Sequence, residues 1–285
     1  LSHDLVSAAT EMSEHVLKTC HSFVMFNRDF AHTLHDRDGN MVSHGVTDLA
    51  GHLGTMHHTA KAMIEAFEGD IHPGDVFITN DPYAGNTHWN DVRVLRPVFY
   101  EGQLFAFMQS SGHWADVGGN VPGSFDVVAN SHYSEALRIP PVRVWSKGKY
   151  IPDVGRLIAL NTRMHRDAEG DLFSQASATA VAERELIRLA DKYGLETILA
   201  AFGELQDYAE RFVRNKLATL PDGTWKRVDY LDIDHGAPAD GLIPVHVKMT
   251  KTDTSLDFDF TGTHPILRSI MNAPFGGTYS AVAVG

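Results

Sequence analysis

The stretch from residue 91 to residue 113 reads DVRVLRPVFYEGQLFAFMQSSGH and decides the fold. Apolar residues fill both sides of a turn at Glu101-Gly102, which is the pattern of two strands joined in a hairpin. In an antiparallel hairpin the numbers of opposing residues add up to a constant, here about 203 for a turn centred on these two residues. Asp91 is then expected to face residue 112, one position from His113, at the open end of the hairpin.

A candidate metal site follows from this hairpin. His88 lies three residues before Asp91, where the loop can turn back, so His88, Asp91 and His113 are expected to converge. Opposing Cβ atoms lie roughly 5 Å apart in such a pair, close enough for imidazole and carboxylate to share one cation. Two imidazoles and one carboxylate suit Zn or Mn, and less well Fe, with positions left open for water or substrate. A cross-strand His–Asp hydrogen bond without metal is the alternative.

Asp116 extends this candidate site. It follows His113 by three residues and is a candidate fourth ligand, an acceptor that orients an imidazole, or a general base. The Gly118-Gly119 pair behind it would allow a loop or substrate to approach closely.

The whole chain predicts an α+β fold of helices and antiparallel hairpins. Helical spacing of apolar residues occurs over residues 4–20, 51–67, 171–192 and 195–219. Residues 30–42 predict a hairpin, residues 75–79 a short buried strand, and residues 117–170 mostly loop with one strand-like patch at 142–145. After residue 221 the apolar pattern alternates, which predicts a second, small antiparallel sheet. We therefore expect a metal-site domain at 1–220 and the start of a β-rich, apparently incomplete unit at 221–285.

Charge and composition exclude several classes of protein. The 285 residues include 36 acidic and 24 basic side chains, and the net charge of −12 argues against a nucleic acid or an anionic membrane as the main partner. No apolar run approaches the roughly 20 residues that span a bilayer, and no secretory leader is expected before the first helix.

The single cysteine, Cys20, rules out an intrachain disulfide and suits the cytoplasm. Near the end of a helix, it is expected to be a buried structural thiol.

Histidine is unusually frequent, with 17 residues. His57-His58 is expected to be a packed or surface pair on a helix, and three others that flank a turn are expected to be solvated: His32, His35 and His44. The sequence contains neither a G-x-x-x-x-G-K-[ST] phosphate loop nor a G-x-S-x-G nucleophile elbow. The glycines of residues 118–123 do not join a strand to a helix, which argues against a dinucleotide site.

An ordered series of short motifs runs through the chain. It begins with GDVFITNDPY at 74–83, followed by GNTH at 85–88 and DV at 91–92. The other motifs are HLGTM at 52–56, GHWADVGG at 112–119, PGS at 122–124, IPP at 139–141, DL at 171–172, DFTGT at 259–263 and NAP at 272–274. This series resembles the hydantoinase B/5-oxoprolinase family over essentially the whole chain. Two features depart from the family pattern: Asn86 stands where Gly is usual, and the family's B-type subunits are about twice this long, which leaves room for part of the site elsewhere.

The resemblance implies a B-type subunit of an ATP-dependent, hetero-oligomeric enzyme. In this family an A-type subunit uses ATP to activate an amide or enolate oxygen by phosphorylation, and the B-type part binds a metal and completes the reaction. The metal positions of the family's carboxylases resemble His88, Asp91 and His113. We expect hydrolysis of a cyclic amide of the hydantoin, lactam or 5-oxoproline type. The alternatives are carboxylation of a ketone enolate, as in acetone and acetophenone carboxylases, a mononuclear iron oxygenase, and a metal-free structural subunit.

Residues beside the motif complete the candidate site. His113 and Asp116 are the candidate catalytic residues. Asn86, Tyr83 and Trp114 are candidates for binding the substrate, with a place in the core as the alternative for the aromatic residues.

Overall fold

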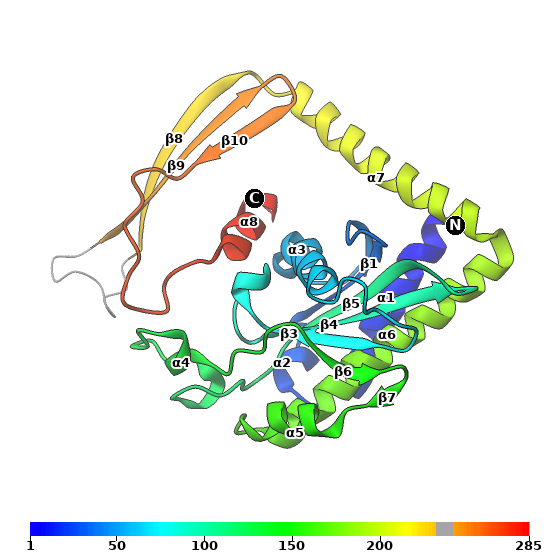
Figure 1. Cartoon of the computed structure of the whole chain (residues 1–285). Helices are drawn as coiled ribbons and strands as arrows, with labels where there is room; N and C mark the ends of the chain where they lie inside the picture. The colour runs from blue at the N-terminus through cyan, green and yellow to red at the C-terminus, as the bar shows by residue number, and fades with distance from the viewer. Residues whose placement is uncertain (232–241, 285) are drawn as a thin grey trace.

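The computed structural model describes residues 1–231 and 242–284, and its centre is a seven-stranded antiparallel sheet (Figure 1). The order across the sheet is β2 (Met41–His44), β1 (Phe30–Asp36), β5 (Gln103–His113), β4 (Asp91–Tyr100), β3 (Val76–Thr79), β6 (Val142–Ser146) and β7 (Lys149–Tyr150). The predicted hairpin of residues 91–113 forms the two longest strands of this sheet and lies near its middle. Every pair of neighbouring strands is antiparallel, so the predicted α+β class is confirmed.

Helices cover both faces of this sheet. On one face α1 (Ser2–Thr19) and α6 (His165–Tyr193) pack together, and the apolar side of α1 joins Val92, Val94 and Val98 in the main core. On the other face α3 (Ala50–Ala66) packs through its own apolar residues against Leu95 and Phe107. Successive residues of a strand point to opposite faces, which is why Val94 and Leu95 belong to different clusters. The short helix α8 (Phe275–Val284) lies against α3 (Figure 1).

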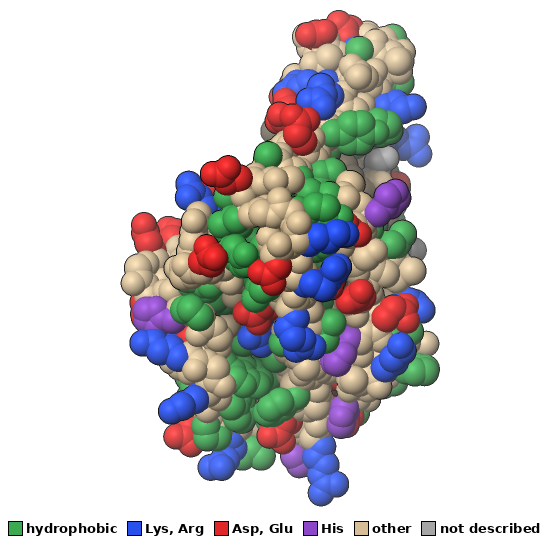
Figure 2. All heavy atoms as spheres, turned by 90° about the vertical axis from the view of Figure 1, so that its right-hand side faces the viewer, with side chains coloured by type: hydrophobic (Ala, Val, Ile, Leu, Met, Phe, Trp, Pro, Cys, Tyr) green, Lys and Arg blue, Asp and Glu red, His purple; other side chains and the backbone are tan. Residues whose placement is uncertain are grey.

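A second, three-stranded antiparallel sheet has the order β10 (Ser255–Asp259), β9 (Ile243–Thr252) and β8 (Gly223–Leu231). The helix α7 (Leu195–Ala218) leads to it from the main body, and most residues of β8 are exposed. The predicted small antiparallel sheet is thus present, and the domain boundary near residue 221 stays a prediction. Figure 2 shows acidic and basic side chains intermixed on the side of α7.

The region 117–170 contains more regular structure than its loop-like composition suggests. Besides β6 and β7 it holds α5 (Pro152–Leu160), the short helix α4 (His132–Glu135), the 3-10 turn η2 (Pro122–Ser124) and the first turns of α6. The prediction of mostly loop was wrong for α5, which begins with Pro152 at a position where proline's missing N–H costs nothing. Two further elements are short: α2 (Phe23–Phe26) precedes β1, and the 3-10 turn η1 (Pro82–Ala84) follows β3.

Two of the three histidines expected in solvent are buried. His32 and His35 lie on β1 and are fully buried, whereas His44 is exposed as predicted. His32 is held by Ser13 and Asp48, and His35 by Thr33 and Gln109. The expectation failed because β1 is an inner strand, covered on both faces.

The histidine pair on α3 matches its expectation, whereas Cys20 is less buried than expected. The rings of His57 and His58 pack 3.9 Å apart against α8, as expected for a packed pair. Cys20 is only partly buried beside the main core, and burial raises the pKa of its thiol. Among the described residues, no helix combines the length and the apolar character needed to cross a membrane.

Candidate metal centre

Asp91 and His113 oppose each other directly in the ladder between β4 and β5. Near the turn, the pairing of Tyr100 with Gln103 follows the predicted register. A bulge between Val98 and Phe99 then shifts the register by one residue. The expected pairing of Asp91 with residue 112 was therefore wrong by one position, and the true register brings the two side chains closer than expected.

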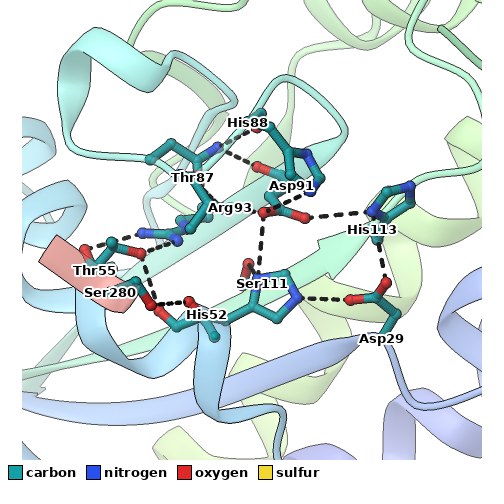
Figure 3. Close-up of polar contacts among 12 residues, drawn as sticks. Asp29, His52, Thr55, Thr87, His88, Asp91, Arg93, Ser111, His113 and Ser280 are labelled. Carbon is teal, nitrogen blue, oxygen red and sulfur yellow. Dashed lines mark hydrogen bonds and ion pairs between the residues drawn. The ribbon is translucent and has the colours of Figure 1, made fainter. Parts of the chain in front are cut away.

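Strand alternation places the polar side chains of this end of the hairpin on the face covered by α3. Asp91 and Arg93 on β4 pair with His113 and Ser111 on β5, so all four belong to the same face as Leu95. His52, in the first turn of α3, approaches them from that helix (Figure 3). The local sequence thus assembles a polar cluster where the hairpin opens.

The three predicted ligands lie together. His88 Nε2 is 3.4 Å from Asp91 Oδ2, and His113 Nδ1 is 3.6 Å from Asp91 Oδ1. One ligand atom from each of the three side chains lies within 4.8 Å of the others, and the two imidazole rings are 5.0 Å apart at 73°. These distances leave space for one cation at the mouth of the hairpin.

A second set of three side chains adjoins the first and shares Asp91. It consists of Asp29, His52 and Asp91, again with ligand atoms within 4.8 Å of one another. Asp29 immediately precedes β1, and its Oδ2 lies 3.6 Å from His113 Nδ1. Neither Asp29 nor His52 was assigned a role from the sequence, although His52 belongs to the HLGTM motif. Asp29 lies beside His113 because Phe30 pairs with Gly112. These residues are too far apart in the chain for local sequence patterns to predict that pairing.

The Asp91 carboxylate has the properties of a metal ligand. It is 1% exposed, the Thr87 hydroxyl donates to Oδ2, and no described residue donates a hydrogen bond to Oδ1. Burial raises its pKa, but the positive potential of His52 and His88, the neighbouring His113 imidazole and the hydrogen bond from Thr87 outweigh this and lower the pKa well below its usual range. A buried carboxylate oxygen with no donor, facing imidazoles, fits a divalent cation.

The same carboxylates act on His113. Burial alone would lower the pKa of the His113 imidazole, but its interaction with the Asp91 carboxylate, and the charge of Asp29, raise it. A cation at this point would compete with the proton for the same nitrogen.

The loop that carries His88 is held from within by Asn86. The Asn86 amide donates to the carbonyls of Asn80 at 3.1 Å, His88 at 3.2 Å and Asp91, and it is fully buried. Gly85, at φ +88°, lies so close to α3 that a Cβ would approach Cβ of His58 to 2.6 Å. The Asn that departs from the family pattern therefore ties the loop together, and its bonds do not support the predicted role in binding substrate.

Asp116 is engaged elsewhere. Its carboxylate accepts hydrogen bonds from the backbone N–H groups of Gly118, Gly123 and Arg163, each at 3.0 Å, and from the Arg163 guanidinium at 3.2 Å. Burial would raise its pKa, but these bonds lower it. Four donors occupy the lone pairs of this carboxylate, so it fastens the loop after β5, and the contacts do not support its predicted role as ligand or general base.

The two aromatic candidates differ in their surroundings. Trp114 is 1% exposed and donates its ring N–H to Gln175 at 2.9 Å, which places it in the core. Tyr83 is 76% exposed, beneath the Arg138 guanidinium and beside Trp89. Only Tyr83 is open to a substrate.

The chain is thus an α+β protein with an antiparallel sheet and a His–Asp cluster at the open end of its central hairpin. The chain belongs to the hydantoinase B/oxoprolinase family, whose model matches residues 1–285. It is 38% identical over 235 residues to the caprolactamase subunit beta of Pseudomonas jessenii, covering 81% of this chain and 40% of that subunit. The chain thus spans less than half the length of this relative.

Two solved structures share the fold. The ATP-dependent caprolactamase of Pseudomonas jessenii superposes with a TM-score of 0.90 at 32% identity, over 99% of this chain and 48% of that one. A nucleotide-free acetone carboxylase superposes with a TM-score of 0.91 at 20% identity, over 99% of this chain and 39% of that one. The second likeness shows the fold alone.

Proposed function

We propose that this chain is the cation-binding part of a B-type subunit in an ATP-dependent enzyme that hydrolyses a cyclic amide. The observation that carries the proposal is the convergence of His88, Asp91 and His113 around a buried Asp91 oxygen to which no residue of the described ranges donates. Similarity to the ATP-dependent caprolactamase favours a lactam or a related cyclic amide as substrate.

The donor set favours Zn or Mn over Fe. Two imidazole nitrogens and a carboxylate oxygen would hold the cation, and Asp29 Oδ2, at 3.6 Å from His113 Nδ1, offers a further carboxylate. The His88 side chain is about half exposed, so the centre faces solvent on that side. An open side is required if water or substrate is to reach the cation.

The chemistry divides between this chain and a partner. A cyclic amide resists hydrolysis because its nitrogen donates electrons into the carbonyl, and phosphorylation of the carbonyl oxygen by an A-type subunit would remove that resonance and supply a leaving group. When bound, the divalent cation supplies Lewis acidity that makes a water molecule acidic near neutral pH. Asp91 and the two histidines would fix the position of that charge, and Tyr83, which is exposed, is the aromatic candidate for contact with the substrate.

Carboxylation of a ketone enolate is the second candidate. Acetone carboxylase shares this fold, and the cluster of His88, Asp91 and His113 would be available to hold an enolate oxygen. A partner that binds ATP is required in both cases.

One experiment separates the candidates. The B-type subunit containing this chain is combined with an A-type subunit and ATP, and offered caprolactam, hydantoin, 5-oxoproline, or acetone with bicarbonate. We expect phosphate release coupled to ring opening of one cyclic amide, and loss of that activity in His88→Ala. Turnover of acetone alone would favour the carboxylase, and ring opening without ATP would contradict the proposal.

A further inference from the structure

His52 lies between the two carboxylates of the centre, with one ring nitrogen facing each of them (Figure 3). Its Nε2 is 2.8 Å from Asp29 Oδ1, and its Nδ1 is 3.5 Å from Asp91 Oδ2 and 3.2 Å from the Ser111 hydroxyl. The imidazole is 3% exposed, so it is shielded from solvent. The proposed reaction assigns it no role.

The contact with Asp29 is directional. An ionised carboxylate only accepts hydrogen bonds, so at 2.8 Å the Nε2–H of His52 donates to Asp29 Oδ1. This bond holds one oxygen of Asp29 and leaves the other, Oδ2, directed toward His113 Nδ1 at 3.6 Å. The rotation of the Asp29 carboxylate, and with it the ligand offered to the cation, is therefore set by His52.

The helix that carries His52 is itself fastened to the sheet. Arg93, two residues beyond Asp91 on β4, donates through its guanidinium to the Thr55 carbonyl at 3.0 Å and to the hydroxyls of Thr55 and Thr59. The Ser280 hydroxyl of α8 donates to the Gly51 carbonyl, at the residue before His52. The turn of α3 that carries His52 is thus fastened to both the sheet and α8, which is what a residue that orients others requires.

We propose that His52 is a positioning residue that orients the Asp29 carboxylate toward the cation held by His88, Asp91 and His113. The inference rests on the proposed cation site. It adds a residue that would influence how tightly the cation binds and how its ligands are arranged. Hydrogen-bond partners of metal ligands characteristically act in this way.

The test uses Co²⁺ as the probe, with affinity measured by calorimetry and ligand geometry by the visible absorption of the cobalt-loaded 285-residue chain. His52→Gln keeps an amide N–H near the place of Nε2, whereas the shorter side chain of His52→Asn cannot reach Asp29. We expect His52→Asn to weaken Co²⁺ binding about 10- to 100-fold and to change the visible bands. His52→Gln should stay within a few-fold of the unaltered chain, and His44→Gln, on an exposed histidine, should have no effect.

A double-variant cycle completes the test. Asp29→Asn should reproduce the loss seen in His52→Asn, and the double variant should bind no more weakly than Asp29→Asn alone. Equal losses in His52→Gln and His52→Asn, additive losses in the double variant, or unchanged binding in His52→Asn would overturn the positioning role while leaving the cation site intact. An unaltered chain that binds no Co²⁺, Zn²⁺ or Mn²⁺ would overturn both proposals.

Discussion

Asp91 and His113 form the last directly opposed pair of the β4–β5 ladder, with 3.6 Å between Asp91 Oδ1 and His113 Nδ1. Their side chains share a face of the sheet because residues directly opposed in an antiparallel pair point to the same side. Without the bulge, Asp91 would lie opposite Gly112, and the His113 side chain would point to the opposite face of the sheet. The position of the bulge between Val98 and Phe99 is therefore a condition for the site.

Arg93 is expected to be important for stability. It is fully buried, and Thr55 and Thr59 on α3 accept its hydrogen bonds. Burial lowers its pKa to about 10, so the guanidinium stays charged at neutral pH. Arg93→Met leaves these buried acceptors without a donor, and we expect a loss of about 2–4 kcal/mol in the free energy of unfolding. Urea denaturation measures this. Arg37→Met, at an exposed position, is the control, and an equally small effect of both changes would refute the role.

Two glycines of α3 provide a matched test of its contact with α8. A Cβ on Gly54 would lie 2.8 Å from Cα of Ser280, whereas a Cβ on Gly51 meets nothing within 4 Å. Gly54→Ala should displace α8 and destabilise the chain by about 1–3 kcal/mol. Gly51→Ala should be neutral or stabilising by up to about 1 kcal/mol, because alanine favours helix.

Hydrogen exchange in residues 275–284 reports this displacement directly. Faster exchange is expected in Gly54→Ala alone. Similar exchange in both alanine variants would show that α8 does not depend on close packing at Gly54.

Asp171 should make stability depend on pH. Its Oδ1 accepts from the backbone N–H groups of His21 and Ser22, while Oδ2 is buried without a described donor. Burial raises its pKa from 3.8 to about 6, so the folded state favours the protonated form. The free energy of unfolding therefore contains a favourable contribution from the protonated carboxyl, which is complete below about pH 4. This contribution falls as the pH rises from about 4 to 6 and is absent above that window. The shift corresponds to about 3 kcal/mol.

The comparison of the unaltered chain with Asp171→Asn isolates this effect. Asparagine keeps an acceptor for the two N–H groups but does not ionise, so the variant should gain about 3 kcal/mol relative to the unaltered chain between pH 4 and pH 7. Urea denaturation at the two pH values measures the gain. The same stability difference at both values would be evidence against a raised pKa.

Local sequence could predict the features of this molecule that depend on residues close together in the chain. The central hairpin follows from its alternating strands and its Glu101-Gly102 turn, and the predicted ligands His88, Asp91 and His113 follow from the hairpin. The resemblance to a known family is confirmed by the family match over the whole chain.

Long-range pairing explains what the sequence did not reveal. Asp29 reaches the centre because β1 pairs with β5, and His52 reaches it because α3 packs on that face of the sheet. Asp116 lies three residues after the candidate ligand His113 and looks available from the sequence, but Arg163, 47 residues later, donates hydrogen bonds to its carboxylate. Spacing identifies candidates, but the competing hydrogen-bond partners come from distant parts of the chain.

Cation binding by the unaltered chain is the central claim, and metal analysis after dialysis against Zn²⁺ or Mn²⁺ tests it most directly. We predict about one divalent cation per chain, retained after removal of free metal, and loss of most of it in His88→Ala but not in His44→Ala. A chain that retains no cation, or a His88→Ala variant that retains as much as the unaltered chain, would contradict the account.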